Sequence, residues 1–300
     1  MKAMILAAGL GTRLRPLTSR RPKALVPVGN RPVIDRAIAY LKGCNITEFV
    51  VNAHHHSRQI IRHLNGGRPF GVEIDVREEK EILGTGGGIK NVWDFWDNTP
   101  FVVMNGDILT DIDLEKAYEM HCESDNLATL ILHDCMPFNQ VRVDDHMNIT
   151  DIAPEDHPDR LAFTGLHIME PELLTHIPEG VFSNIIDIYR RLITLGRPIR
   201  AYISEHHYWR DIGSIGSYLL ANKEALGKDP FRLGPHCRIH SSARLNDWAV
   251  IGEEARLEEG VEITRSVLWE NVVIKKGVKV IDSIITSSRK VELDQVGKVL

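Results

Sequence analysis

The stretch LAAGLGTRLRP, from Leu6 to Pro16, decides which fold to expect, because glycines follow an apolar run and a proline then interrupts any helix. In a dinucleotide-binding fingerprint the third glycine lies in a helix that begins at once and holds the pyrophosphate at its amino end. Here that position is Leu14, and Pro16 disfavours a helical conformation at Arg15. The stretch therefore predicts a glycine loop that approaches a phosphate ligand with no helix behind it.

Positive charge gathers just after this loop. The segment 13–23 contains no acidic residue and carries five basic ones, namely Arg13, Arg15, Arg20, Arg21 and Lys23. The whole chain of 300 residues has a net charge of -5, which argues against a general nucleic-acid surface. The pattern favours an anionic small molecule as the ligand.

The four cysteines, Cys44, Cys122, Cys135 and Cys237, show neither CxxC spacing nor a regular framework, so we expect reduced thiols and a cytoplasmic protein. The chain opens on a short apolar run ended by glycine, unlike a signal peptide, and no stretch of about 18 apolar residues follows. We therefore expect no membrane partner.

Apolar runs that read as buried strands alternate with segments of helical period, which predicts an α/β fold with a parallel sheet covered on both faces. The expected strands are 3–7, 48–52, 72–76, 101–105 and 127–133, and the expected helices are 33–42 and 57–64. Beyond residue 133 the alternation becomes irregular, with further strands at 161–169 and 197–204 around a helix near 184–196. We interpret this part as a substrate lobe.

From Ile239 onward the apolar residues recur every six positions. One row runs Ile239, Leu245, Ile251, Leu257, Ile263 and Trp269, and a second row, four residues behind, runs from Ala243 through Ala249, Ala255, Val261 and Val267 to Val273. A helix would scatter such a period, whereas a parallel β-helix turns it inward in every coil. The pattern weakens at Lys275 and Lys279, so we expect about three coils and a boundary near 231–235.

Two further motifs carry candidate ligand groups. Asp107 follows the apolar run 101–104 and the flexible pair Asn105-Gly106, where the carboxyl end of a strand would place a carboxylate at the sheet crevice. The run Leu83 to Ile89, LGTGGGI, fits no Walker A motif and reads as a glycine loop before a helix. Its small residues Gly84, Thr85, Gly86 and Gly87 would let a nucleoside lie against the backbone, although a structural hinge is the alternative.

The motifs LAAGLGTRLRPLT (6–18) and RPKALVPVGNRPVID (21–35) together resemble the signature of the sugar-1-phosphate nucleotidyltransferase family, GxGTRLxPLT followed by PKxLxPV. Later segments agree in order: LGTGGGI (83–89), VMNGDIL (103–109), FTGLHIMEPELL (163–174) and WRDIGSIGSYLLAN (209–222). The resemblance implies a Rossmann-like, GT-A-like three-layer domain with a mixed, mainly parallel sheet over residues 1–232. It also implies a short left-handed parallel β-helix of hexapeptide repeats over 233–300.

By this resemblance the protein would join a nucleoside triphosphate to a sugar-1-phosphate and release pyrophosphate, through in-line attack on the α-phosphate assisted by Mg²⁺. Arg13 would hold the triphosphate and Lys23 the sugar phosphate or α-phosphate, while Asp107 and Asp211 would bind the metal. Ala8, Gly9, Gly11 and Thr12 would line the nucleotide, and Asn105, Thr164 and Gly165 would meet the sugar.

Within the family the run TGGGI and the segment MNGD resemble N-acetylmuramate-1-phosphate uridylyltransferases, whereas the tail and WRDIGS resemble mannose-1-phosphate guanylyltransferases. Both bases stay open, and glucose-1-phosphate stays open as acceptor. A catalytically silent regulatory homologue that only binds a sugar nucleotide is the alternative function. For the tail we expect homo-oligomerisation or regulation rather than a part in the chemical step.

Overall fold

The computed structural model describes all residues from 1 to 300, which form two compact units. The first unit comprises residues 1–10 and 36–209, and the second comprises residues 11–35 and 210–300. Each unit is thus built from segments far apart in the sequence. No helix is long and apolar enough to cross a membrane.

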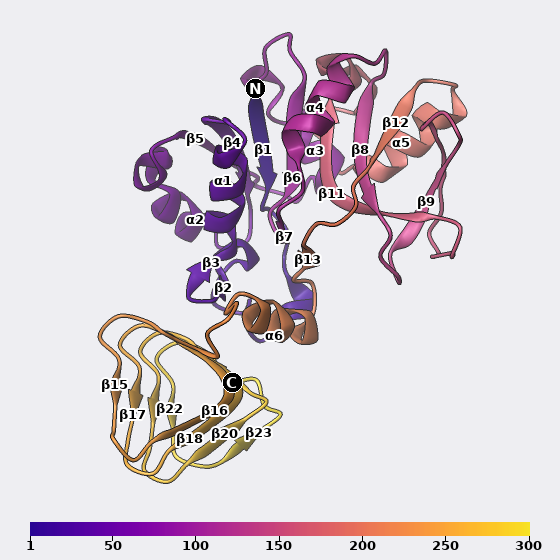
Figure 1. Cartoon of the computed structure of the whole chain (residues 1–300). Coiled ribbons are helices and arrows are strands. Elements are labelled where there is room, and N and C mark those ends of the chain that lie inside the picture. Colours follow the sequence, from indigo (N-terminus) through magenta and orange to yellow (C-terminus); the bar gives the residue numbers. More distant parts are fainter. The chain divides into compact units, whose positions relative to one another are not determined.

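The first unit is built on one mixed sheet (Figure 1). Strands β6, β1, β4 and β5 lie side by side in parallel, and β11 pairs antiparallel with β6, β8 and β9. The parallel strands β1, β4, β5 and β6 are the ones that strand and helix alternation predicted, and the antiparallel β11 lies beyond residue 133, where the alternation becomes irregular. The nine strands are β1 (Lys2–Leu6), β4 (Glu48–Ala53), β5 (Glu73–Glu78), β6 (Phe101–Asn105), β8 (Ala128–His133), β9 (Asn139–Val143), β10 (Ile149–Ile152), β11 (Leu161–Met169) and β12 (Ile199–Ile203).

Helices cover both faces of this sheet. Consecutive residues of β1, Ala3, Met4 and Ile5, are all 0% exposed, which happens only when the two faces of a strand are both packed. On one face the buried residues of α5, among them Tyr189, pack with those of β1, β6 and β8. The helices are α1 (Val33–Gly43), whose first residues belong to the second unit, α2 (Ser57–Leu64), α3 (Gly84–Lys90), α4 (Leu114–Cys122) and α5 (Ile185–Thr194).

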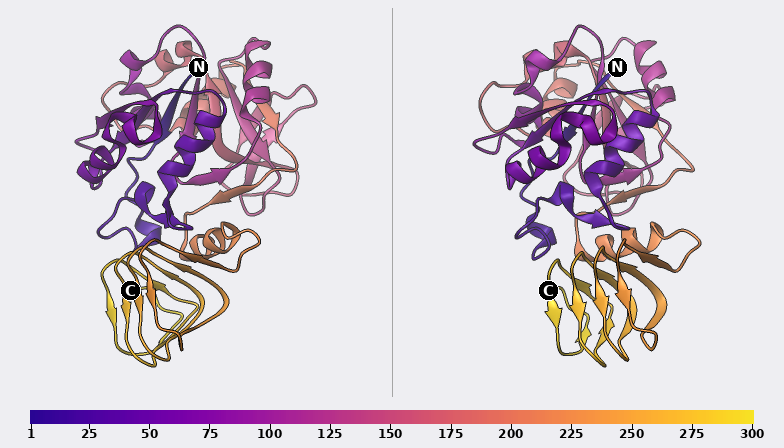
Figure 2. Two further views of the ribbon diagram at one scale, coloured as in Figure 1. Left: turned by 60° about the vertical axis from the view of Figure 1, so that its left-hand side comes forward. Right: turned by 90° about the vertical axis from the view of Figure 1, so that its left-hand side faces the viewer.

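The second unit combines residues 11–35 with helix α6 (Ile215–Glu224) and a stack of parallel strands (Figure 2). The register joins Arg238 to Arg256 and Arg256 to Val273, so the chain returns to the same place after 18 and then 17 residues. One face of the stack holds β15 (Arg238–Ile239), β17 (Arg256–Leu257), β19 (Val273–Ile274) and β22 (Lys290–Val291). The other strands are β14 (Phe231–Leu233), β16 (Arg244–Ile251), β18 (Glu262–Leu268), β20 (Lys279–Ile281), β21 (Ile284–Ile285) and β23 (Gln295–Val296).

The expected number of about three turns is too low, because one face alone carries four strands in parallel register. The apolar rows do not stop at Lys275. After Trp269 they move by one position, because the turn has lost one residue, and Val272, Ile274, Val278 and Val280 are the buried residues that continue them. A strict six-residue period therefore fails after Trp269, although the rows of buried side chains continue in the structure.

Candidate functional site

The loop after β1 adopts the turn that the sequence predicted. Gly11 lies in the left-handed region with φ 61°, and a Cβ there would meet Thr18 Cγ2 at 2.8 Å. The buried Thr18 hydroxyl donates a hydrogen bond of 2.8 Å to the Gly11 carbonyl and fixes the bend. Only a single 3₁₀ turn, Thr12–Leu14, follows before Pro16, so no helix stands behind the glycines.

Three predicted site residues converge within the second unit. Lys23 Nζ lies 3.9 Å from Asp211 Oδ1, and the two side chains are only 14% and 21% exposed. A Cβ placed on Gly213 would be 2.6 Å from Asp211 Oδ2 and 2.9 Å from Arg13 Nη2, so Arg13 and Asp211 close around the same glycine. Two cations beside one carboxylate leave an excess of positive charge that suits a phosphate.

Asp211 is held by the start of helix α6. Its backbone carbonyl accepts a hydrogen bond from the Ser217 hydroxyl, and Ser214 caps the helix by accepting from the Ser217 N–H at 3.1 Å. The strand β13 (Trp209–Asp211) therefore delivers Asp211 to a fixed place. This local structure explains why the carboxylate can face Lys23 without being fully exposed.

In the first unit, the carboxyl ends of β1 and β6 and the middle of β11 bring another group of predicted residues together. Asn105 ends β6 opposite Leu6 of β1, and the Gly106 N–H donates to the Leu6 carbonyl at 2.9 Å. Gly165 lies in an irregular part of β11 with φ 79°, and a Cβ there would be 2.5 Å from Asn105 Nδ2. Asp107 follows directly, partly exposed, between β6 and β7 (Ile108–Thr110).

Thr164 is less available than the sequence indicated. It is 1% exposed, its hydroxyl donates to the Ile131 carbonyl at 2.8 Å, and its own carbonyl accepts from Trp209 Nε1 at 2.8 Å. Both polar groups are thus already hydrogen-bonded within the protein. The residue shapes the irregular part of β11 that presents Gly165 to Asn105.

The expectation of a glycine loop at 84–87 is wrong in its secondary structure, because Gly84–Lys90 form helix α3. The glycines are required by the chain segment 181–183, which lies against the helix. A Cβ on Gly84 would be 2.5 Å from the Ser183 carbonyl oxygen, and one on Gly87 would be 2.7 Å from that of Val181. The Gly86 N–H already donates to the Ser183 carbonyl at 2.9 Å, and the Thr85 hydroxyl accepts from the Ile185 N–H at 2.9 Å.

Sequence reasoning missed a buried pair beneath the first loop. Asn52 Oδ1 accepts from the Ala7 N–H at 2.7 Å, while Asn52 Nδ2 donates to Glu79 Oε1 at 2.7 Å. The second Glu79 oxygen accepts from the Leu83 N–H at 3.1 Å, and both side chains are almost fully buried. The pair joins the loop 7–10, with Ala8 and Gly9, to the start of α3. The polar Asn52 at the end of an apolar strand was the available signal.

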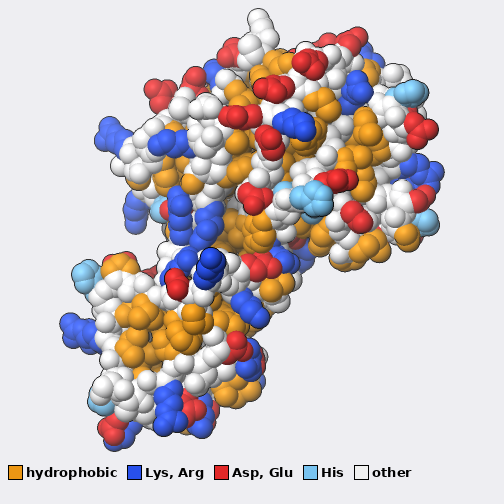
Figure 3. All heavy atoms as spheres, in the orientation of Figure 1, with side chains coloured by type: hydrophobic (Ala, Val, Ile, Leu, Met, Phe, Trp, Pro, Cys, Tyr) orange, Lys and Arg blue, Asp and Glu red, His pale blue; other side chains and the backbone are white.

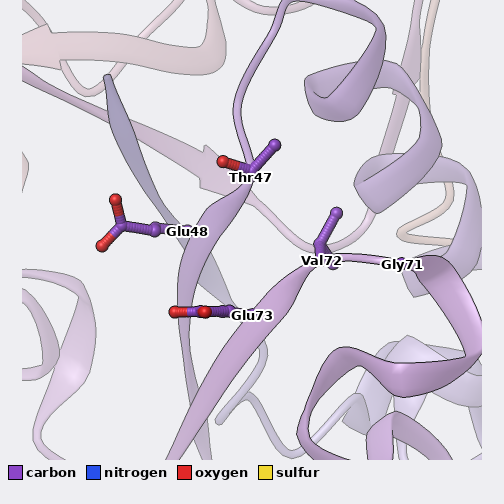
Figure 4. Close-up of a pocket in the computed structure, with 5 residues that line it drawn as sticks. All are labelled: Thr47, Glu48, Gly71, Val72 and Glu73. Carbon is purple, nitrogen blue, oxygen red and sulfur yellow. The ribbon is translucent and has the colours of Figure 1, made fainter.

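The hollow in Figure 4 is a different place. It lies at the amino ends of β4 and β5 and is lined by Thr47, Glu48, Gly71, Val72 and Glu73, none of which is a predicted site residue. Glu48 and Glu73 are partners in the parallel register, so their carboxylates stand side by side. Two like charges at this end of the sheet disfavour a polyphosphate.

Comparison with known proteins decides the family. The nucleotidyl transferase family matches residues 2–228. The chain belongs to the nucleotidyl transferase family. This confirms the predicted resemblance to sugar-1-phosphate nucleotidyltransferases and the Rossmann-like α/β fold with a mixed, mainly parallel sheet.

Relatives of this nucleotidyltransferase carry more specific names. It is 31% identical to a UTP--glucose-1-phosphate uridylyltransferase of Synechocystis sp., over 95% of this chain and 82% of that protein. It is 34% identical to an N-acetylmuramate alpha-1-phosphate uridylyltransferase of Neisseria meningitidis serogroup B, over 72% of this chain and 94% of that protein. A putative glucose-1-phosphate thymidylyltransferase from Bacillus anthracis, solved in complex with a sucrose, superposes with a TM-score of 0.68 and 26% identity, over 76% of this chain and 96% of that one.

Proposed function

We propose that the protein forms a nucleoside diphosphate sugar and pyrophosphate from a nucleoside triphosphate and a sugar-1-phosphate. The observation that carries the proposal is the convergence of Lys23, Arg13 and Asp211 within one unit. A reaction between two polyanions needs positive groups that hold both partners in line and offset the charge that builds on the leaving pyrophosphate. This cluster supplies such groups.

In this mechanism Arg13 binds the triphosphate and Lys23 orients the phosphate that attacks, so that no covalent enzyme intermediate is required. Lys23 Nζ lies 3.9 Å from Asp211 Oδ1, and its role in the proposal is to position a phosphate. In the same proposal Gly9, Gly11 and Thr12 line the nucleotide, and Asn105 and Gly165 lie nearest the sugar.

The donor set fits a magnesium ion. Asp107 and Asp211 are partly exposed carboxylates, and such hard oxygen ligands are what Mg²⁺ prefers. With few protein ligands, substrate phosphates would complete the coordination of the ion. When bound, Mg²⁺ would neutralise phosphate charge at the reacting centre.

The substrates are tested together by measuring pyrophosphate release. A panel of UTP, GTP, dTTP, CTP and ATP against glucose-, mannose-, N-acetylglucosamine- and N-acetylmuramate-1-phosphate should give turnover with one preferred pair. We propose a uridylyl- or guanylyltransferase of the cytoplasm that serves cell-envelope polysaccharide synthesis. No turnover with any pair would refute the function and leave the silent regulatory homologue, which binds a sugar nucleotide without reacting.

The metal ligand is tested by Asp107→Ala, with the exposed Asp125→Ala as the matched control. The first variant should lose Mg²⁺-dependent turnover and keep the unfolding temperature of the parent, and the second should keep both. Retained turnover in Asp107→Ala would remove this residue from the site.

For the tail we propose a left-handed parallel β-helix of hexapeptide repeats over residues 233–300, appended to a catalytic domain of residues 1–232, through which the protein forms a homo-oligomer. The proposed oligomer is supported by the exposure of apolar side chains in the first turn of the stack. Phe231, Ile239 and Leu245 are only partly buried, whereas Leu257 and Ile263 of the next turn are buried. Hydrophobic side chains gather on the end of the stack that faces the viewer in Figure 3. An exposed apolar end of this kind is typical of a surface that another molecule covers.

The oligomer is tested by light scattering on the parent and on a Leu245→Glu variant, whose charge lies at the apolar end. A smaller particle in the variant would support assembly through the tail. A parent that is already monomeric at micromolar concentration would refute it.

A further inference from the structure

The signature segment 21–30, which contains Lys23, is held from outside at several points, and each anchor lies in α6 or in the tail. Arg21 provides the first anchor. Its Nη1 donates to Glu270 Oε2 at 3.4 Å, its Nη2 bonds the other carboxylate oxygen, and it also donates to Ser287 Oγ at 3.1 Å. The guanidinium lies over the ring of Trp269, 4.6 Å from its centre, a geometry that favours a cation.

Trp269 carries the second anchor through a buried relay. Its Nε1 donates to the Tyr218 hydroxyl at 2.9 Å, and that hydroxyl donates to the Pro27 carbonyl at 2.7 Å. Trp269 is 3% exposed and Tyr218 is 0% exposed. A chain of hydrogen bonds in such a dry place resists displacement, because breaking one link leaves a buried polar group unpaired.

Two more contacts fix the end of the segment. The Gly29 N–H donates to Asn222 Oδ1 at 2.9 Å, and Asn30 Nδ2 donates to the Ile251 carbonyl of the tail at 2.8 Å. Asn222 is fully buried and also donates to the Tyr218 carbonyl at 3.0 Å. The segment is therefore held at Arg21, which precedes Lys23 in the sequence, and at Pro27, Gly29 and Asn30, which follow it.

Helix α6 holds Asp211 through Ser217, as described above, and it holds Pro27 through Tyr218. Both members of the Lys23–Asp211 pair are thus held by α6. The tail residues Trp269 and Glu270 support this arrangement by bonding Tyr218 and Arg21. Lys23 is two residues from Arg21, so a loosened Arg21 moves the lysine directly.

We propose that the tail positions the reacting site: Glu270 and Trp269 are positioning residues that hold the signature segment so that Lys23 faces Asp211 and the substrate phosphates. The inference rests on the proposed function and deepens it. It also changes the expectation drawn from the sequence, in which the tail served assembly and had little effect on the chemical step.

The test compares Glu270→Ala with Asp282→Ala in the full-length protein. Asp282 pairs with Arg265 on the outer surface of the same stack, bonding its Nε at 2.6 Å and its Nη2 at 2.8 Å, so the control also removes one carboxylate from an arginine. Glu270→Ala should lower kcat/KM by roughly 10- to 100-fold, the loss expected when a reacting group is misplaced by about 1 Å. Asp282→Ala should stay within about twofold of the parent.

Three further measurements separate positioning from a general loss of structure. Glu270→Gln keeps an oxygen that accepts from Arg21 and should recover part of the rate. Trp269→Phe, which loses the donor to Tyr218, should lower kcat/KM as well. Amide hydrogen exchange of the peptide that covers 21–30 should increase in Glu270→Ala and not in Asp282→Ala, while the exchange of strands β1 and β6 stays unchanged.

The inference is overturned if Glu270→Ala equals Asp282→Ala both in kcat/KM and in the exchange of residues 21–30. It is also overturned if exchange increases throughout the chain, because Glu270 would then support the fold in general. A parent without pyrophosphate release would defeat the proposed function alone, since the exchange measurement still reports whether Glu270 holds the segment.

Discussion

The buried histidine of β11 predicts a defined loss of stability in mild acid. His167 is 1% exposed, and its Nδ1 is hydrogen-bonded with the Tyr189 hydroxyl. Burial lowers the pKa of His167 to about 3. Since burial disfavours the charged imidazolium, the ring stays neutral at every pH at which the protein is expected to work.

The sign follows from comparing the folded and unfolded chains. An exposed histidine in the unfolded chain has a pKa of about 6.5, so the unfolded state takes up a proton below that pH while the folded state does not. The stability is complete above about pH 6.5 and falls as the pH drops toward 3. Each pH unit in that window costs about 1.4 kcal/mol, which makes the loss between pH 7 and pH 5 about 2 kcal/mol for this residue.

The assay is urea unfolding at pH 7 and pH 5, followed by circular dichroism, for the parent, His167→Gln and the exposed His206→Gln. The first variant cannot take up the proton, so its free energy of unfolding should depend less on pH than that of the parent by about 2 kcal/mol over this interval. His206→Gln should follow the parent. Equal pH dependence in the parent and in His167→Gln would refute the reasoning.

Three further outcomes are expected. Gly165→Ala places a methyl group 2.5 Å from Asn105 Nδ2 at a φ of 79°, so it should lower the free energy of unfolding by about 1 to 3 kcal/mol and also reduce turnover; an unchanged unfolding temperature would contradict the strain. Ile263→Ala, at a fully buried position of the tail, should cost about 2 to 5 kcal/mol, seen as faster amide exchange in β16, β18 and β20, whereas the exposed Leu293→Ala should leave exchange alone. Removal of divalent metal with EDTA should stop pyrophosphate release, and added Mg²⁺ should restore it; turnover that persists in EDTA would argue against the metal.

The sequence was most informative where burial and period agree. The runs 101–105 and 161–169 are strands with these bounds, and the helix at 57–64 begins and ends where predicted. A short apolar run between turn residues such as Gly, Pro, Asn or Asp is typical of a strand that is buried on both faces. Pro16 likewise excluded a helix after the first glycines, because its ring acts on the backbone of Arg15 whatever surrounds it.

The failures have tertiary causes. Glycine has a low helix propensity, so the glycine-rich run 83–89 was predicted to be a loop. The structure has a helix there, and the carbonyls of Val181 and Ser183 approach Gly84 and Gly87 too closely for a Cβ. The Asn52–Glu79 pair joins strands that no local pattern relates. Arg21 and Glu270 are 249 residues apart, and a charged residue in a basic run gives no sign of so distant a partner.

The division of the second unit between the two ends of the chain bears on how the protein is made. Residues 11–35 leave the ribosome well before the residues that hold them, which lie between Tyr218 and Ser287. During translation this basic segment has none of its final partners and is open to chaperones, to nucleic acid or to proteolysis. Closure over so long a loop is slow compared with local contacts. A chain that ends before Trp269 would therefore have its first strand but would lack the tail residues that hold segment 21–30.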